Sequence, residues 1–322
     1  MNPLRFLQLI GVLILLSACG ASRNIRIDNY LLQSSCNQQN RYAYTKEELP
    51  VDLHQKSLDT LLLTTISFES LNVANAIGII DKLEAYVKVK REYLRKPTLE
   101  NRLDYIELSS FIKNRINLAS LEISATASEM DCEEERTSQI ADYLKRKEDD
   151  KETKLTVSSI VVGATGAILT AAIEKSKPEK AVGLSTGITE AFLGVMILLN
   201  KKKIEFSHPR NSLKEIWEGR EVSDIFPPSI WYYLNYYDPN GKIPSSRRVE
   251  LIQKWVNFGQ ISDIKSKKKS QLLNLYFGEG GKYTAEQLAN RANMYDQLES
   301  YINLMKQDLN KLSFEFEKLE KL

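Results

Sequence analysis

The C-terminal part of the chain carries its most regular pattern of apolar positions. Thr284 and Gln287 stand at the two positions of a helix capping box. Apolar residues then recur in steps of three and four, with one irregular step, which is the spacing of a coiled-coil seam of about five heptads. The seam predicts one long helix, packed either on a helical hairpin of the same chain or on a second copy of the chain. Its members are Ala285, Leu288, Ala292, Tyr295, Leu298, Ile302, Met305, Leu309, Leu312, Phe316 and Leu319.

Two earlier apolar series predict an antiparallel pair of long helices over residues 51–154. The break between them is Lys96-Pro97-Thr98, because proline disfavours the α conformation in the residue before it and Thr98 can cap the next helix. Each helix should contain about forty residues and measure roughly 60 Å. The first series is Leu58, Leu62, Val73, Ile77, Ile80 and Val87, and the second is Leu99, Leu103, Ile106, Ile112, Ile116, Ala119, Ile123, Ala127 and Met130.

Residues 155–203 predict a second hairpin, whose arms (155–173 and 181–200) contain one charge, Glu190, and are joined by a short charged turn. Each of its arms is long enough to cross about 30 Å of hydrocarbon as a helix. Small residues recur at every fourth position, which is typical of helices that pack closely in lipid. Polar residues in the first arm and basic residues outside both arms leave two interpretations open: insertion into a bilayer, or burial inside the bundle. The small positions are Ser159, Gly163, Ala167, Gly183, Gly187 and Ala191.

The composition favours the same all-α class. Only 14 Gly and 9 Pro punctuate 322 residues, which is sparse for a protein of many short strands. The net charge of +2 gives no overall attraction for nucleic acid, so no nucleic-acid partner is expected. We therefore predict an all-α fold, an elongated helical bundle or coiled coil with a central glycine-rich apolar hairpin.

The first residues have the layout of an export signal. Arg5 precedes an apolar run, which ends in Leu16-Ser17-Ala18-Cys19. This sequence resembles the lipobox of bacterial lipoproteins. The resemblance implies that residues 1–18 are removed, and that Cys19 becomes the first residue and carries fatty chains, palmitate among them. Since residue 20 is Gly and not Asp, it also implies the periplasmic face of the outer membrane, or the cell surface in a host with one membrane.

The two remaining cysteines, Cys36 and Cys132, predict a disulfide. An exported compartment is oxidising, and an even pair of cysteines there is expected to be bonded. Two buried thiols are the alternative.

An aromatic-rich stretch lies between the apolar hairpin and the C-terminal helix. One interpretation is a docking surface for a partner protein, because Tyr and Trp are common at interfaces. The other is a small satellite core over the bundle, which would include Trp217 and Trp255. The candidate docking residues are Phe226, Trp231, Tyr232, Tyr233, Tyr236 and Tyr237.

The remaining motifs give no support for catalysis. Gly278–Thr284 lacks the spacing of a phosphate-binding loop and is expected to form a turn. His54 and His208 have no cysteine or carboxylate at metal-ligand spacing. No enzyme activity, no metal and no cofactor are expected.

These features divide the chain into six predicted segments. Residues 1–18 are the signal, 19–50 a polar tether, 51–154 the helical hairpin, 155–203 the apolar hairpin, 204–260 short aromatic-rich helices, and 261–322 the C-terminal helix.

Two functions fit these segments. The first is a lipid-anchored scaffold or docking component of an envelope assembly for secretion or transport, with an envelope protein as its partner and self-association left open. The second is a membrane-inserting protein similar in layout to α-helical pore-forming toxins.

Overall fold

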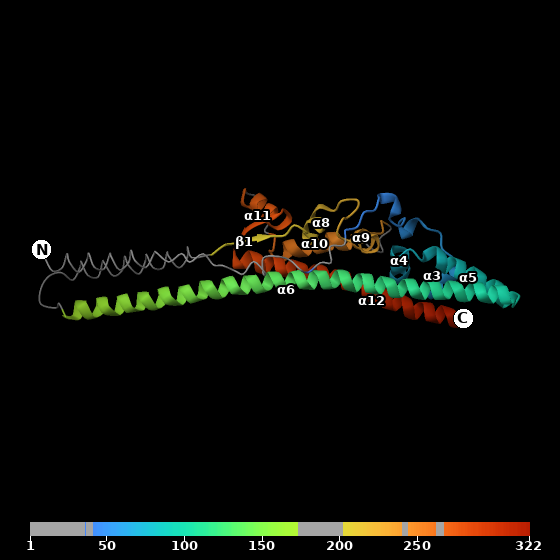
Figure 1. The fold of residues 1–322 in the computed structure, drawn as a ribbon, viewed down its shortest axis with the longest axis horizontal. Helices are drawn as coiled ribbons and strands as arrows, with labels where there is room; N and C mark the ends of the chain where they lie inside the picture. The colour runs from blue at the N-terminus through green and yellow to red at the C-terminus, as the bar shows by residue number, and fades with distance from the viewer. Residues whose placement is uncertain (1–35, 37–40, 173–201, 240–243, 262–266) are drawn as a thin grey trace. The chain divides into compact units, whose positions relative to one another are not determined.

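The computed structural model describes residue 36 and residues 41–172, 202–239, 244–261 and 267–322, with the side chains of 154–172 and 267–269 excepted. The described residues belong to one compact unit, Ser34–Leu322, and the fold is all-α, as predicted. Figure 1 shows the order of its elements. The helices are η1 (Lys46–Glu48), η2 (Leu53–Gln55), α3 (Thr60–Thr65), α4 (Phe68–Ala76), α5 (Ile80–Arg95), α6 (Leu99–Ala172), α8 (Ser212–Glu218), α9 (Pro228–Asn235), α10 (Arg247–Asn257), α11 (Lys267–Phe277) and α12 (Ala285–Lys321).

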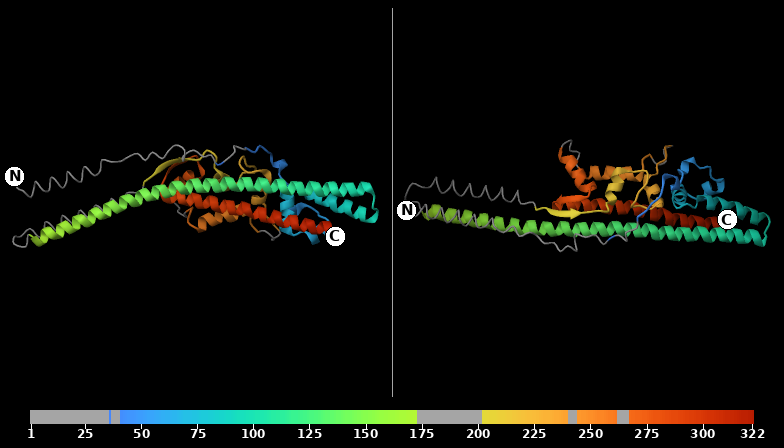
Figure 2. Two further views of the ribbon diagram at one scale, coloured as in Figure 1. Left: turned by 60° about the horizontal axis from the view of Figure 1, so that its bottom comes forward. Right: turned by 45° about the horizontal axis from the view of Figure 1, so that its top comes forward.

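The core is built on the pair α6 and α12, which run side by side in both views of Figure 2. Thr284 and Gln287 form the predicted capping box at the start of α12. All eleven residues of the predicted C-terminal seam are buried. They face α6, where the middle and end of the second predicted series, from Ile112 to Met130, are buried as well. The partner of the seam is therefore the N-terminal half of the same chain.

The first arm of the predicted N-terminal hairpin is three helices and not one. Ile66 is extended, with φ −110° and ψ 129°, and Ser67 caps the start of α4. Gly78 then ends α4 with a φ of 74°, a conformation that costs glycine little. The second arm is longer than predicted, because α6 has 74 residues and continues into the first arm of the apolar hairpin. At 1.5 Å per residue it measures about 110 Å.

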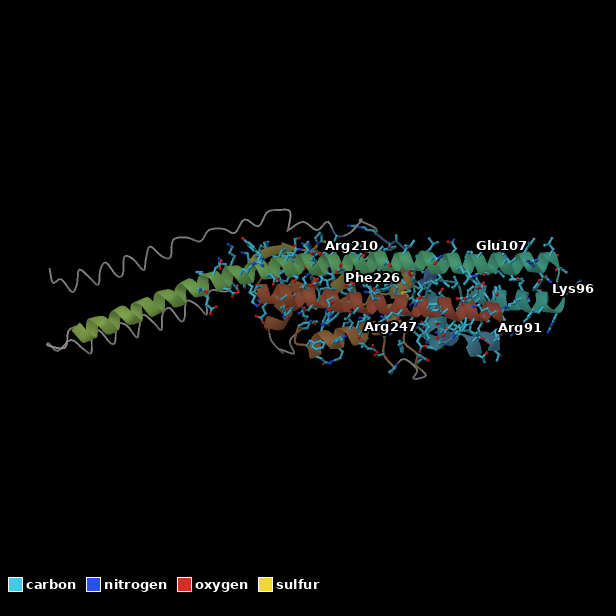
Figure 3. The ribbon with its side chains drawn as sticks, turned by 90° about the horizontal axis from the view of Figure 1, so that it is seen from below. Arg91, Lys96, Glu107, Arg210, Phe226 and Arg247 are labelled. Carbon is cyan, nitrogen blue, oxygen red and sulfur yellow. A yellow bond between two sulfur atoms is a disulfide. The ribbon has the colours of Figure 1, made fainter. Side chains whose placement is uncertain are left out.

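The first three apolar residues predicted for the face of α6 are exposed, so that part of the prediction is wrong. Leu99, Leu103 and Ile106 are 72%, 56% and 45% exposed. The reason is the length of α12, which ends level with Ser109 and Lys113: both side chains contact the carboxylate of Glu320. Figure 3 shows the end of the α5–α6 hairpin, at Lys96, extending past the last turn of α12.

A two-stranded sheet was not predicted. Strands β1 (Ile204–Ser207) and β2 (Gly280–Tyr283) pair antiparallel, with Ile204 opposite Tyr283 and Ser207 opposite Gly280. The glycine-rich segment is thus a strand as well as a turn. Gly280 has a φ of 108°, and a Cβ there would lie 2.2 Å from the carbonyl oxygen of Phe206. Only glycine lets the two backbones approach this closely.

Most of the predicted apolar hairpin lies outside the described residues. Gly183, Gly187 and Ala191 belong to that part, whereas Ser159, Gly163 and Ala167 lie within the backbone of α6 with side chains not described. Among the described residues, no helix is both long and apolar enough to cross a membrane. Insertion of the hairpin stays a prediction.

Candidate functional site

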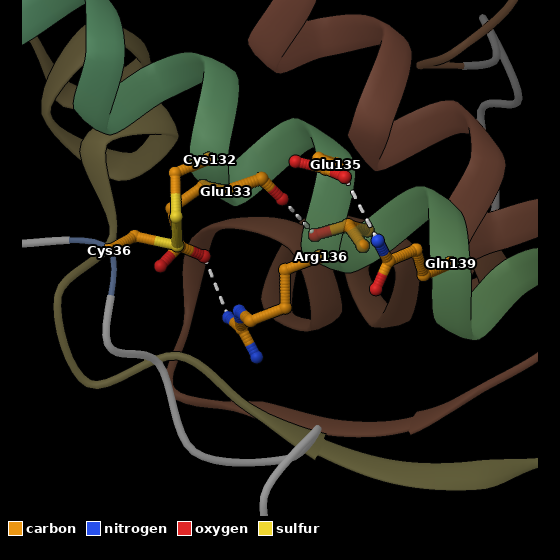
Figure 4. Close-up of a disulfide and its surroundings, with 7 residues drawn as sticks. Cys36, Cys132, Glu133, Glu135, Arg136 and Gln139 are labelled. Atoms are coloured by element: carbon orange, nitrogen blue, oxygen red, sulfur yellow. Dashed lines mark hydrogen bonds and ion pairs between the residues drawn. A yellow bond between two sulfur atoms is a disulfide. The ribbon is translucent and has the colours of Figure 1, made fainter.

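A disulfide fastens the N-terminal segment to α6. Cys36 and Cys132 are bonded, with their Cα atoms 5.4 Å apart, and the bond joins positions 96 residues apart (Figure 4). The prediction of a bonded pair is confirmed. Glu133, the next residue of α6, forms a buried ion pair of 2.6 Å with Arg136 one turn further along, and the Arg136 guanidinium lies 4.4 Å from the centroid of the Phe206 ring. The bond therefore sits against the folded core.

The aromatic-rich stretch is not a docking surface. Phe226, Trp231, Tyr232, Tyr233 and Tyr236 are all buried, and of the six candidates only Tyr237, which is 52% exposed, reaches solvent. The alternative interpretation, a small core, is the correct one. Aromatic rings with a polar atom can be buried when that atom finds a partner.

The polar atoms of three of these rings, Tyr232, Tyr233 and Trp231, have such partners. The Tyr232 hydroxyl accepts hydrogen bonds from the Leu53 amide at 3.1 Å and from Asn75 Nδ2 at 2.9 Å. The Tyr233 hydroxyl donates to Asp308 Oδ2 at 2.6 Å. Trp231 Nε1 donates to two backbone carbonyls of the preceding loop. The stretch thus ties α9 to both α4 and α12.

Trp217 and Trp255 lie in a second aromatic cluster, around Phe277 of α11. Trp217 stacks on Phe277 with ring centroids 4.7 Å apart, and Trp255 lies 6.1 Å from the same ring. Trp255 is fully buried. The aromatic core therefore has two parts.

The opposite, outer face of α6 does carry exposed apolar residues. Phe111, Leu118 and Leu121 are 48%, 49% and 68% exposed. Two residues along an α-helix turn it by about 200°, so Leu118 points away from buried Ile116, and Leu121 points away from buried Ile123. In the right-hand view of Figure 2, α6 lies along one edge of the described helices.

These residues belong to a second heptad series, which we name the outer seam. Its spacing alternates between three and four residues, and each member is exposed. No member carries a charge. The next position of the series is Cys132, where the disulfide is attached. The outer seam consists of Phe111, Asn114, Leu118, Leu121, Ala125 and Ser128.

Charged residues that flank the outer seam are engaged with the body of the protein. Glu122 accepts a hydrogen bond from Ser229 at 2.7 Å. Glu129 forms an ion pair of 2.6 Å with Arg210. On the other side, Lys306 of α12 donates to Ser124. The seam therefore presents a neutral strip with half-exposed apolar side chains, which suits a partner helix.

A buried polar cluster is the other site with unusual chemistry. Arg291 is fully buried, and it donates to the carbonyl oxygen of Tyr276 at 2.6 Å and to Asn211 Oδ1 at 3.1 Å. His208 Nε2 lies 2.8 Å from the Tyr283 hydroxyl. Burial, with Arg291 adding to it, lowers the pKa of His208 to about 2, so the imidazole is neutral. These bonds link the segment between β1 and α8 to β2, α11 and α12, which is a structural role.

The low pKa of His208 predicts a pH-dependent loss of stability. Between the folded pKa and the unfolded value of about 6.5, only the unfolded chain binds the proton. This contribution is therefore complete above pH 6.5 and is lost as the pH falls. We expect the free energy of unfolding of the wild type to fall by roughly 1 kcal/mol more per pH unit between pH 6 and 4 than that of the His208→Gln variant. Urea unfolding at several pH values measures this difference, and parallel curves would contradict it.

A groove between α6 and α12 is lined by ion pairs. Its apolar floor is Ile116 and Phe316, and Lys113 and Glu320 close one side at 2.7 Å. Its four charged residues are paired with one another, Lys113 with Glu320 and Lys321 with Glu317. Among the described residues, no group of three or more His, Cys, Asp or Glu could hold a metal ion.

Comparison with protein-family models, with curated proteins and with solved structures finds no match. What the fold and the site define is an all-α protein built on a long helix pair, closed by one disulfide and bearing a neutral apolar seam. Cys19, the predicted lipid attachment, lies outside the described residues.

Proposed function

We propose that this protein is a lipid-anchored helical scaffold that docks on an envelope assembly of the secretion or transport type, without catalysis. Cys19 carries the lipid, and the anchor lies on the periplasmic face of the outer membrane, or on the cell surface of a host with one membrane. The observation that carries the docking function is the outer seam.

The outer seam supports docking for an energetic reason. Apolar surface that stays in water gains about 25 cal/mol per Å² when a partner covers it. An exposed series with heptad spacing matches the side of a second helix with the same spacing. Because no member of the seam is charged, docking on Leu118 and Leu121 removes no seam charge from water, and the Lys82 ammonium over the Phe111 ring, at 5.6 Å, adds a charge at one end only. We therefore take the partner to be a helix of an envelope protein with apolar residues in steps of three and four.

The test of docking places charge in the seam. Replacement of Leu118 and Leu121 by Glu puts two carboxylates at the centre of the contact, and their desolvation should weaken binding by at least about tenfold. Affinity purification from crosslinked cells should recover a stoichiometric envelope protein with the wild type and not with the double variant. The matched control is Phe314→Glu on α12, where the side chain is also exposed, at 60%. Equal recovery with both variants, or no partner with the wild type, contradicts the proposal.

The test of the anchor is separate. Wild-type protein should take up labelled palmitate and sediment with membranes, whereas Cys19→Ser should do neither. A wild type without label contradicts the lipid anchor and leaves the seam result intact.

Membrane insertion of residues 155–200 is the second candidate. It is favoured by the course of α6, which continues unbroken from Glu148 to Ala172. The chain is again beside Glu148 at Lys202, whose amide donates to Glu148 Oε1 at 2.7 Å. Both ends of the predicted hairpin are thus held together at one point, as a hairpin requires. Leakage of liposomes caused by the chain from residue 20 onward would support this candidate, and intact liposomes would exclude it.

A further inference from the structure

The end of the α5–α6 hairpin extends beyond the rest of the bundle. α12 ends where Lys90 of α5 donates to the carbonyl oxygens of Leu319 and Glu320, at 2.8 and 2.7 Å. Past that level α5, the short connection and the first turns of α6 continue, and α12 does not (Figures 1 and 3). Tyr93 and Tyr105, with ring centroids 5.1 Å apart, hold the two helices together there. We name residues 91–103 the hairpin tip.

The hairpin tip exposes large apolar side chains. Leu94, Leu99 and Leu103 are 65%, 72% and 56% exposed, which places them among the most exposed apolar residues of the described chain. Leu94 lies one helical turn beyond Lys90, where α12 no longer covers α5. Leu99 and Leu103 follow immediately in the first turns of α6. These three leucines lie outside the core. Exposed apolar side chains grouped at one place on a protein are typical of surfaces that bind another protein or a membrane.

The same end carries unpaired positive charge. The hairpin tip, residues 91–103, contains four Lys and Arg against two Glu, a net charge of +2 that equals the net charge of the whole chain. Arg91 is engaged with Asp59 at 2.6 Å, and Lys90 with the end of α12. The other three basic residues of the tip are exposed and have no ion pair among the described residues: Arg95, Lys96 and Arg102.

We propose that the hairpin tip binds the surface of an anionic lipid bilayer, with the three leucines in the interface and the basic side chains on the headgroups. Apolar residues surrounded by Lys and Arg have the composition of interfacial membrane-binding segments. The positive charge is what selects this occupant over a second copy of the chain, whose own tip would repel it. The outer seam, which is neutral, contains no such charge. This proposal is independent of the docking proposed for that seam.

The experiment places a fluorescent probe at the hairpin tip, so that it reports only on that part of the protein. Binding to vesicles measured on the whole protein would also include binding through the predicted apolar hairpin or through the lipid on Cys19. The chain from residue 20 onward contains the whole compact unit Ser34–Leu322. With Cys36 and Cys132 kept in their disulfide, Glu100→Cys gives a single site for the fluorophore NBD. Vesicles of phosphatidylglycerol mixed with phosphatidylcholine should shift its emission to the blue, and pure phosphatidylcholine vesicles should not. NBD at Lys318→Cys, on the exposed last turn of α12, should stay in water on both.

Two sets of variants separate the two parts of the tip. Leu94→Ser, Leu99→Ser and Leu103→Ser together should abolish the shift. Arg95→Gln, Lys96→Gln and Arg102→Gln together should raise the lipid concentration at half-maximal shift by more than about tenfold. Each basic residue near an anionic surface strengthens binding to it by a similar amount, so the loss of three is large. The matched controls are Leu63→Ser with Phe258→Ser, and Lys282→Gln with Lys318→Gln, all at exposed positions. Circular dichroism checks that each variant is folded.

Three results would overturn the proposal. The first is a probe at residue 100 that stays in water on both kinds of vesicle. The second is an equal shift on neutral vesicles, which removes the role of charge. The third is an equal loss in the control variants. If the probe stays in water and a protein crosslinks to the tip in cells, the occupant is a protein and the lipid proposal is wrong.

Discussion

Replacement of Cys132 by Ser is expected to lower the free energy of unfolding by about 4–5 kcal/mol. The disulfide closes a loop between residues 96 positions apart, and a long loop restricts the unfolded chain strongly. The chain-entropy relation gives about 4.7 kcal/mol for a loop of a hundred residues. For a protein of this size, that loss corresponds to a fall of roughly 10 °C in the unfolding temperature. Guanidinium unfolding of the oxidised wild type and the variant measures it.

The control for the disulfide is replacement of its other cysteine, Cys36. Cys36→Ser and the double variant should lose the same amount as Cys132→Ser, because each removes the same crosslink. Reduction of the wild type should also reproduce the loss. A difference below about 1 kcal/mol between wild type and variants, or additive losses in the double variant, would mean that the crosslink does not act through the unfolded chain.

The second large effect is expected at the contact of α6 with α12. Leu298 is fully buried near the middle of the C-terminal seam. Leu298→Ala removes apolar contacts and leaves a cavity that the two long helices close only in part, so it should cost about 3–5 kcal/mol. The midpoint of guanidinium unfolding measures this loss.

Leu304→Ala is the matched control, since it is the same change on the same helix at a side chain that is 37% exposed. It should cost less than about 1 kcal/mol. Similar losses for the two variants would show that the seam of α12 does not pack on α6 as described.

The C-terminal helix was predictable because its information is local and repeated. Eleven apolar residues in steps of three and four define one face of α12, and no Gly or Pro interrupts it. The buried part of α6, from Ile112 to Met130, follows from the same reasoning. What periodicity could not give is where the partner helix ends. Leu99 and Leu103 have the spacing of a buried face, but α12 stops before it reaches them.

The breaks in the N-terminal arm depend on tertiary contacts. Ser67 begins α4, and its amide and hydroxyl both donate to Glu315 of α12, which the local sequence does not reveal. The sheet depends on the pairing of two short segments, β1 and β2, that are far apart along the chain. Neither has the length or alternation that identifies a strand by itself.

The site was the least predictable part. The aromatic stretch was open to two interpretations, and the burial of Trp231 and Tyr233 decides between them because their polar atoms find partners on loops and on α12. The outer seam has a signal in the sequence: Leu118 and Leu121 continue a second heptad series beside the first. The sequence shows that α6 has two apolar faces, but not which of them is buried. Only the positions of the neighbouring helices distinguish the core face from the exposed face.

The position of the disulfide determines how mechanical tension travels through the protein. From Cys36, two covalent routes lead to Cys132: the sulfur bridge, and the backbone through α3, α4, α5 and the first half of α6. A pull on the amino terminus tightens the shorter route first, so the load enters α6 directly at residue 132. The helices between the two cysteines carry no load while the disulfide is intact. After reduction of the disulfide the force would pass through them, and they would unfold first.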